Sequence, residues 1–223
     1  MRKRIFYGCI VVIIIILNVY FVILLKRGII LTKENPIIQE LYQKSHPSQE
    51  ASVLKELYQE DGFTNKYILA VGMKEYLKQN KKETISEEEI EQTIQSLFKD
   101  TSFSHESFYL MADNICGFHY DKEKHVYESL SNCEENKKES YEQEITSLNK
   151  LGNKIFIREK VLFLIKEEDI SIYASSNKKE LLGKVKQENY HKEDYMDKAI
   201  TYEFVFTLMN GNYVLTDLHR IKE

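Results

Sequence analysis

The chain of 223 residues has no tryptophan and contains only two prolines and eight glycines. So little proline and glycine argues against a disordered chain, and the lack of any long internal repeat argues against solenoids and propellers. Tyrosine and phenylalanine are plentiful instead, with 15 Tyr and 11 Phe residues. Because these residues favour strands, the composition predicts an aromatic core with much β-structure.

Sequence motifs of known catalysts are also missing. No P-loop, G-x-G-x-x-G, G-x-S-x-G, C-x-x-C or H-E-x-x-H pattern occurs. S-x-x-K is present, but S-D-N and K-T-G, which accompany it in penicillin-recognising enzymes, are absent. Its repeated occurrence in a lysine-rich chain is therefore background. We expect no enzyme and no cofactor.

One stretch lacks charged residues altogether, namely Ile5–Leu25, which follows basic residues 2–4 and precedes Lys26 and Arg27. At about 1.5 Å rise per residue, a helix of this length covers the ~30 Å hydrocarbon core of a bilayer. The run is longer than the apolar part of a signal peptide, and no small-x-small cleavage site follows it. The sequence therefore predicts an uncleaved transmembrane helix over Ile5–Leu25 that attaches the chain to a membrane.

The distribution of charge bears on location and partners. All 35 acidic residues follow residue 27, whereas five of the 31 basic residues precede residue 28. An acidic globular part is unsuited to binding nucleic acid or an anionic membrane surface. The basic N-terminus favours the cytoplasmic side by the positive-inside rule. We expect a single-pass cell-membrane protein whose C-terminal domain is extracytoplasmic.

Local signals predict helices between residues 36 and 100. The Asn-Pro pair at residues 35–36 provides an N-cap and a first helical residue, and Ser48 can cap the next helix. A third helix is predicted over residues 64–79 from its apolar spacing. The S-x-x-E sequence at residues 86–89 is a capping box followed by apolar residues at helical spacing. It is the clearest local signal in the chain.

From residue 102 onward the pattern changes to short aromatic and β-branched runs separated by turns, which is typical of strands. Gly117–Asp121 and Lys124–Ser129 are predicted to form a hairpin around Lys122 and Glu123.

Later segments complete the predicted sheet. Residues 154–166 fit a long strand, and residues 200–208 and 213–221 fit a hairpin with an Asn-Gly turn. Tyr141–Leu151 fits both a strand and a helix, and residues 181–182 suggest a short helix. Helices followed by antiparallel strands make the expected fold class α+β.

The predicted fold is thus an N-terminal transmembrane helix, then a helical segment followed by an antiparallel β-sheet. Residues 36–223 are expected to form one domain. The expected parts are a cytoplasmic tail (1–4), the transmembrane helix (5–25), a juxtamembrane connector (26–35), a helical segment (36–100) and an antiparallel sheet region (101–223).

Several segments, among them NPIIQELY, ISEEEIEQTIQSLF, CGFHYDKEKHVYES and KIFIREKVLFLI, resemble those of uncharacterised single-span extracytoplasmic proteins of low-GC Gram-positive bacteria. This resemblance covers most of the chain after the apolar run and implies no activity. The element order of residues 141–223 is also similar to NTF2-like and cystatin-like domains. Some conjugation and secretion proteins join such a domain to one N-terminal span, which implies a structural subunit of an envelope assembly as an alternative.

Cys116 and Cys133 flank the predicted hairpin. Outside the cell they could form a disulfide that closes a loop of about 18 residues, worth ~3 kcal/mol in the chain-entropy model. In the predicted register residue 116 faces residue 129, so Cys133 would have to fold back by a few residues. Two unpaired thiols, or a reactive Cys116, are the alternatives.

His119, His125 and Asp121 suggest a metal site at first sight. In the predicted register His119 pairs with Val126 and Tyr120 pairs with His125. The two histidines then point to opposite faces of the hairpin, because side chains alternate along a strand. They cannot share one ion, so we expect no metal site.

These observations predict a domain that binds a protein partner in the envelope, or a small ligand, and catalyses nothing. The different interpretation is an extracytoplasmic enzyme with a site in the concavity of the sheet, which needs titratable groups converging on one pocket. Asp217 and His219 lie two residues apart on the last predicted strand and are candidates by residue type. A solvated edge strand explains this pair more simply.

Overall fold

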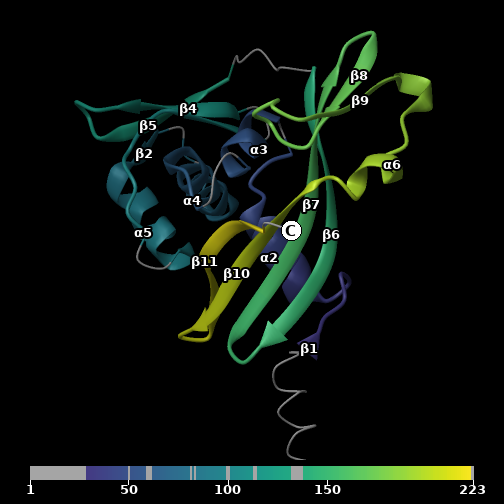
Figure 1. The fold of residues 1–223 in the computed structure, drawn as a ribbon. Coiled ribbons are helices and arrows are strands. Elements are labelled where there is room, and N and C mark those ends of the chain that lie inside the picture. The colour runs from purple at the N-terminus through teal and green to yellow at the C-terminus, as the bar shows by residue number, and fades with distance from the viewer. Residues whose placement is uncertain are drawn as a thin grey trace, which may run out of the picture.

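The computed structural model describes residues 29–221, except residues 50, 59–61, 81, 83, 99–100, 113–114 and 132–137. The fold is α+β and combines a few helices with two antiparallel sheets, called sheet A and sheet B below (Figure 1). The helices are α2 (Pro36–Ser45), α3 (Ala51–Leu57), α4 (Asn65–Gln79), α5 (Glu87–Leu97) and α6 (Glu193–Met196), with a 3₁₀ turn at Gln187–Asn189.

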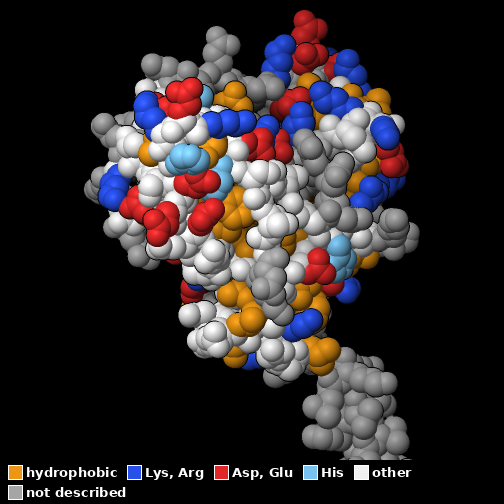
Figure 2. Space-filling view, turned by 90° about the vertical axis from the view of Figure 1, so that its left-hand side faces the viewer, with side chains coloured by type: hydrophobic (Ala, Val, Ile, Leu, Met, Phe, Trp, Pro, Cys, Tyr) orange, Lys and Arg blue, Asp and Glu red, His pale blue; other side chains and the backbone are white. Residues whose placement is uncertain are grey.

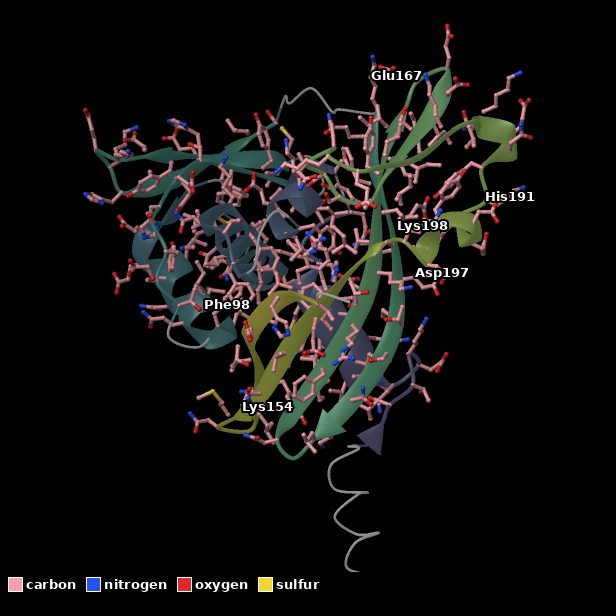
Figure 3. All side chains as sticks on the ribbon, viewed as in Figure 1. Phe98, Lys154, Glu167, His191, Asp197 and Lys198 are labelled. Atoms are coloured by element: carbon pink, nitrogen blue, oxygen red, sulfur yellow. The ribbon has the colours of Figure 1, made fainter. Side chains whose placement is uncertain are left out.

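Sheet A has seven strands in the order β1-β6-β7-β10-β11, and β8 and β9 extend it beside β7. The long strand β7 pairs with β6, with β10 and, near its end, with β8. Figure 3 shows Lys154 and Glu167, which bracket β7, at opposite ends of the sheet. The strands are β1 (Ile29–Ile30), β6 (Glu139–Leu151), β7 (Lys154–Lys166), β8 (Asp169–Tyr173), β9 (Leu181–Lys186), β10 (Ile200–Met209) and β11 (Asn212–Ile221).

Sheet B has four strands in the order β2-β5-β4-β3. Helices α3 and α4 lie between the two sheets, and both contact β3 (Figure 1). Helix α5 lies against α4 and reaches β11 of sheet A. The strands of sheet B are β2 (Thr84–Ser86), β3 (Phe108–Ala112), β4 (Ile115–Asp121) and β5 (Val126–Leu130).

The main core is aromatic, as the composition predicted. It joins the helices to the inner faces of both sheets, because α2, α3 and α4 bury their apolar sides against them. A smaller apolar cluster on the opposite side of β7 joins β8 and α6 to Leu162 and Leu164. The largest fully buried side chains include Tyr67, Tyr127, Phe118, Phe163, Phe204 and Phe206.

The predicted starts of α2, α4 and α5 are confirmed, whereas the predicted Ser48 cap stays a prediction because α3 starts at Ala51 after a residue that is not described. Asn35 accepts a hydrogen bond from the amide of Ile37 at the start of α2, and Thr64 caps α4. At the start of α5, Ser86 and Glu89 form the complete capping box. The closing hairpin is also confirmed, since β10 and β11 pair around the Asn-Gly turn.

The predicted fold class is wrong in its opening element and in its order. No helix in the described part of the chain is long and apolar enough to cross a membrane. The predicted span, Ile5–Leu25, lies outside the described residues. The helices also do not precede all strands: β2 lies between α4 and α5 because Ile85 is fully buried and its neighbours pair with β5. Residues Ile29–Ile30, in the predicted connector, pair with β6.

The predicted register of the β4–β5 hairpin is wrong by two residues. His119 pairs with Glu128, and Gly117 pairs with Leu130. The turn spans residues 122–125 because the Asp121 carboxylate accepts hydrogen bonds from the amides of residues 123 and 124. His125 adopts a positive φ of 56° and belongs to this turn.

The short helix predicted at residues 181–182 is also wrong, because this segment forms strand β9. Its pairing with β8 turns Leu182 and Val185 toward the smaller apolar cluster. Gly183 lies against the ring of Tyr195, where an added Cβ would overlap the ring. Tyr141–Leu151, which fitted either structure, lies within strand β6.

Candidate functional site

A polar groove of about 660 Å³ lies between α5, the end of α4 and the start of β11. Its walls carry amide, hydroxyl and carboxylate groups, with a few apolar side chains. The lining residues are Lys44, Glu75, Tyr76, Asn80, Glu89, Gln92, Thr93, Ser96, Leu97, Asn212 and Tyr213.

The capping box and the sheet together hold α5 in place along this groove. At its start, Ser86 and Glu89 fix the first turn of the helix. At its end, buried Phe98 forms a parallel bridge with Leu215 of β11. Figure 3 shows Phe98 at this junction. The groove is therefore bounded on one side by α5, a helix that is fixed at both ends.

The carboxylates of the groove have cationic partners. Glu89 forms an ion pair with Lys82 and accepts a hydrogen bond from the Tyr76 hydroxyl at 2.8 Å. The hydrogen bond from Lys82, followed by that from the Ser86 amide, lowers the pKa of Glu89 to about 2. Glu75 pairs with Lys78. The groove thus offers mainly neutral hydrogen-bonding groups to a ligand.

A buried polar network lies deeper, between α2 and sheet A. The Glu159 side chain on β7 is fully buried, and its carboxylate accepts hydrogen bonds from the Tyr42 hydroxyl at 2.8 Å and the Tyr58 hydroxyl at 2.7 Å. Nε2 of His46 lies 3.0 Å from the same carboxylate. Nδ1 of His46 lies 2.9 Å from the carbonyl oxygen of Tyr42, which can only accept. The side chains of Tyr42, His46, Tyr58 and Glu159 thus form one buried hydrogen-bonded network.

This network has no room for a ligand. The His46 ring stacks on Tyr42 at 4.0 Å and contacts Phe204. Burial raises the pKa values of Tyr42 and Tyr58, and the nearby Glu159 charge adds to the effect. Both tyrosines thus remain protonated donors. We interpret the network as a polar clamp that ties α2 and the end of α3 to β7.

The predicted pair Asp217 and His219 lies on β11. His219 contacts Asp217 at 3.4 Å and Glu203 of β10 at 3.2 Å. Glu203 is buried and also pairs with Arg158 of β7. These contacts form a cross-strand ion-pair cluster.

A third cluster, at the start of α5, has the composition of a metal site. Glu87, Glu91 and His105 place one ligand atom each within 4.8 Å of the others. His125 lies next to it, with Nδ1 at 2.6 Å from Glu87. Figure 2 shows histidine and acidic side chains close together on the face formed by α5 and the β4–β5 hairpin.

The predicted cysteine pair is placed only in part. Cys116 is buried on β4, and its sulfur lies 3.3 Å from the carbonyl oxygen of Leu130. Cys133 lies outside the described residues, so the Cys116–Cys133 disulfide stays a prediction. The corrected register places the strand partner of residue 116 two positions nearer to residue 133 than predicted.

His119 and His125, for which the sequence predicted no shared metal ion, have separate partners in the structure. His119 contacts the Ser107 hydroxyl at 3.3 Å, whereas His125 contacts Glu87. The sequence reasoning overlooked the cluster of Glu87, Glu91 and His105. Its one sequence signal is the i, i+4 spacing of the two glutamates on a helix.

The buried clamp was also overlooked. Its sequence signal is Glu159, the one acidic residue at alternate positions 155–163, which are otherwise apolar. The spacing of Tyr42 and His46 by one helical turn is a second, weaker signal.

Comparison with protein-family models, with curated proteins and with solved structures finds no match to this chain.

Proposed function

We propose that the described part of the chain is a non-catalytic binding domain that takes a segment of a protein partner in the groove between α5 and β11. The observation that carries this proposal is the groove itself, whose volume of about 660 Å³ falls in the range of ligand sites. Attachment to a membrane and an extracytoplasmic location stay predictions from the sequence.

The chemistry of the walls favours a polypeptide segment as the ligand. Asn80, Gln92 and Asn212 carry amides, which can both donate and accept hydrogen bonds, as a peptide backbone requires. Leu97 and Tyr213 supply apolar surface for a side chain of the partner. Because Glu75 and Glu89 have lysine partners, the groove has no strong preference for a cationic ligand.

The same walls favour binding without catalysis. The described residues that line the groove include no histidine, cysteine or aspartate. Its two aliphatic hydroxyls donate to main-chain oxygens of their own helix: Thr93 to Glu89 at 2.9 Å and Ser96 to Thr93 at 2.7 Å. Neither hydroxyl faces a base, so neither is activated as a nucleophile.

An enzyme site on sheet A would need open space on the face around Glu159. Helix α2 covers this face, and the space that an enzyme site requires is filled by Tyr42, His46 and Tyr58 around Glu159.

Site-directed photo-crosslinking in the cell that makes the protein tests this proposal. A photoreactive residue at Ser96, inside the groove, should yield one dominant adduct with another protein. The matched control is the same residue at exposed Lys184 on β9. Adding Gln92→Trp to the Ser96 variant should abolish the adduct, because the indole fills the groove. Equal adducts from both positions, or none from Ser96, would refute the proposal.

A further inference from the structure

We propose that Glu87, Glu91 and His105 bind a divalent transition-metal ion of the zinc class. The site is separate from the groove, and the proposal does not depend on the binding function proposed above. Two ligands come from the first turns of α5, and the third comes from the segment between α5 and β3.

The distances between the ligand atoms fit such an ion. Nε2 of His105 lies 3.0 Å from Oε1 of Glu87 and 3.2 Å from Oε1 of Glu91. Tetrahedral coordination with bonds of about 2.0–2.1 Å places ligand atoms roughly 3.3 Å apart. Two of the three separations are therefore close to ligand spacing, and the two carboxylate oxygens lie within 4.8 Å of each other.

Two of the three proposed ligands, His105 and Glu87, are held by outer partners. Nδ1 of His105 lies 2.8 Å from the hydroxyl of buried Tyr127, which fixes the ring and leaves Nε2 directed at the carboxylates. The second oxygen of Glu87 contacts Nδ1 of His125 at 2.6 Å and the Tyr120 hydroxyl at 3.0 Å. Metal sites use this arrangement to set the tautomer and orientation of their ligands.

The two carboxylates of the cluster also favour binding of a cation. One nitrogen, Nε2 of His105, lies 3.0 Å from a carboxylate oxygen of Glu87 and 3.2 Å from one of Glu91. A divalent ion bound between these groups compensates the charge of both carboxylates. The positive end of the α5 dipole opposes the ion only weakly compared with two direct carboxylate ligands.

The site is open to the solvent, unlike the buried clamp of His46 and Glu159. The Glu91 side chain is 46% exposed, whereas Glu159 of the clamp is fully buried. In the cluster on sheet A, Arg158 already compensates the charge of Glu203. Within the described residues, only the set at α5 combines ligand spacing, excess negative charge and access for an ion and a water.

Titration of the purified, detergent-solubilised full chain with zinc chloride tests the proposal. Isothermal titration calorimetry should show one ion per chain, and Co²⁺ in its place should show the visible absorption of a four-coordinate site. Glu91→Gln and His105→Gln should each weaken zinc binding by at least tenfold. The matched controls are His119→Gln on β4 and His219→Gln in the sheet A cluster, which should leave binding unchanged.

Thermal unfolding separates loss of the site from loss of the fold. Zinc should raise the unfolding temperature of the wild type and not that of Glu91→Gln, whose temperature without zinc should lie only slightly below that of the wild type because this side chain is half exposed. No binding by the wild type would overturn the proposal. Binding that survives both Glu91→Gln and His105→Gln would equally overturn it.

Discussion

Two histidine–carboxylate clusters of this protein contain similar groups and have opposite environments. His46 and Glu159 are 1% and 0% exposed, and tyrosine hydroxyls satisfy the remaining carboxylate sites. His105 meets two carboxylates on a surface that solvent reaches. The buried pair is complete without a ligand, whereas in the exposed cluster one histidine nitrogen faces two carboxylates. Burial and donor count, more than residue type, therefore distinguish a structural clamp from a binding site.

The largest loss of stability is expected from Glu159→Ala, which removes the carboxylate of the buried clamp. The change leaves the buried donors Tyr42, Tyr58 and His46 without their acceptor. Breaking a buried ion pair by removing one partner costs about 3–5 kcal/mol of the free energy of unfolding. Urea denaturation of the variant measures this loss.

The control for this change is Glu144→Ala on the neighbouring strand β6. Glu144 is 47% exposed and meets Lys192 only at 3.6 Å, so the expected loss is below about 1 kcal/mol. Equal losses in the two variants would show that the clamp does not stabilise the fold.

An intermediate case is Glu89, which lies between the two cluster glutamates on α5 but faces Lys82 and Tyr76. Its folded pKa of about 2 lies below the ordinary value of 4.5. The stabilisation is therefore complete above about pH 4.5 and is lost as the pH falls toward 2. Glu89→Gln should be less stable than the wild type at pH 6, by up to about 1 kcal/mol for a partly exposed pair.

Denaturation of both proteins at pH 6, 4 and 2.5 measures this pH dependence. The difference in the free energy of unfolding should shrink at each step. Thr93→Val, on the same helix but without a titrating group, should show a constant difference. A constant difference for Glu89→Gln would contradict the assigned interactions of this carboxylate.

The smallest effect is expected from Glu91→Gln in the presence of a chelator. The pair with His105 is partly exposed, so its removal should lower the free energy of unfolding by no more than about 0.5–1 kcal/mol. Urea denaturation with and without excess salt measures it, and salt should shrink the difference. A loss as large as that of Glu159→Ala would show that the surface cluster is structural as well.

Local features of the fold were predictable because they depend on neighbours in the sequence. The capping box at Ser86 and Glu89 and the Asn35 cap set helix starts through hydrogen bonds that span only a few residues. The alternation of apolar and polar residues along β10 also predicted the strand correctly. Thr201 and Glu203 on its polar side are nevertheless buried, because sheet A is covered on both faces at that point.

Contacts between distant residues were not predictable in this way. The hairpin register depends on the turn that the Asp121 side chain closes. The predicted register differed by two residues and placed His125 in a strand, whereas in the structure His125 lies in the turn, beside Glu87. The groove residues likewise come from α2, α4, α5 and β11, which no local pattern brings together.

The amino-acid sequence by itself therefore determined where most helices and strands begin and that the domain has an aromatic α+β core. Hydrogen bonds and side-chain spacing within one element suffice for that. Only the tertiary structure decided that His46 meets Glu159, 113 residues away, and that His105 meets Glu87 and Glu91. These contacts depend on how α2, α5 and the two sheets pack against one another. The packing determines which charged side chains are buried together and which stay exposed to solvent.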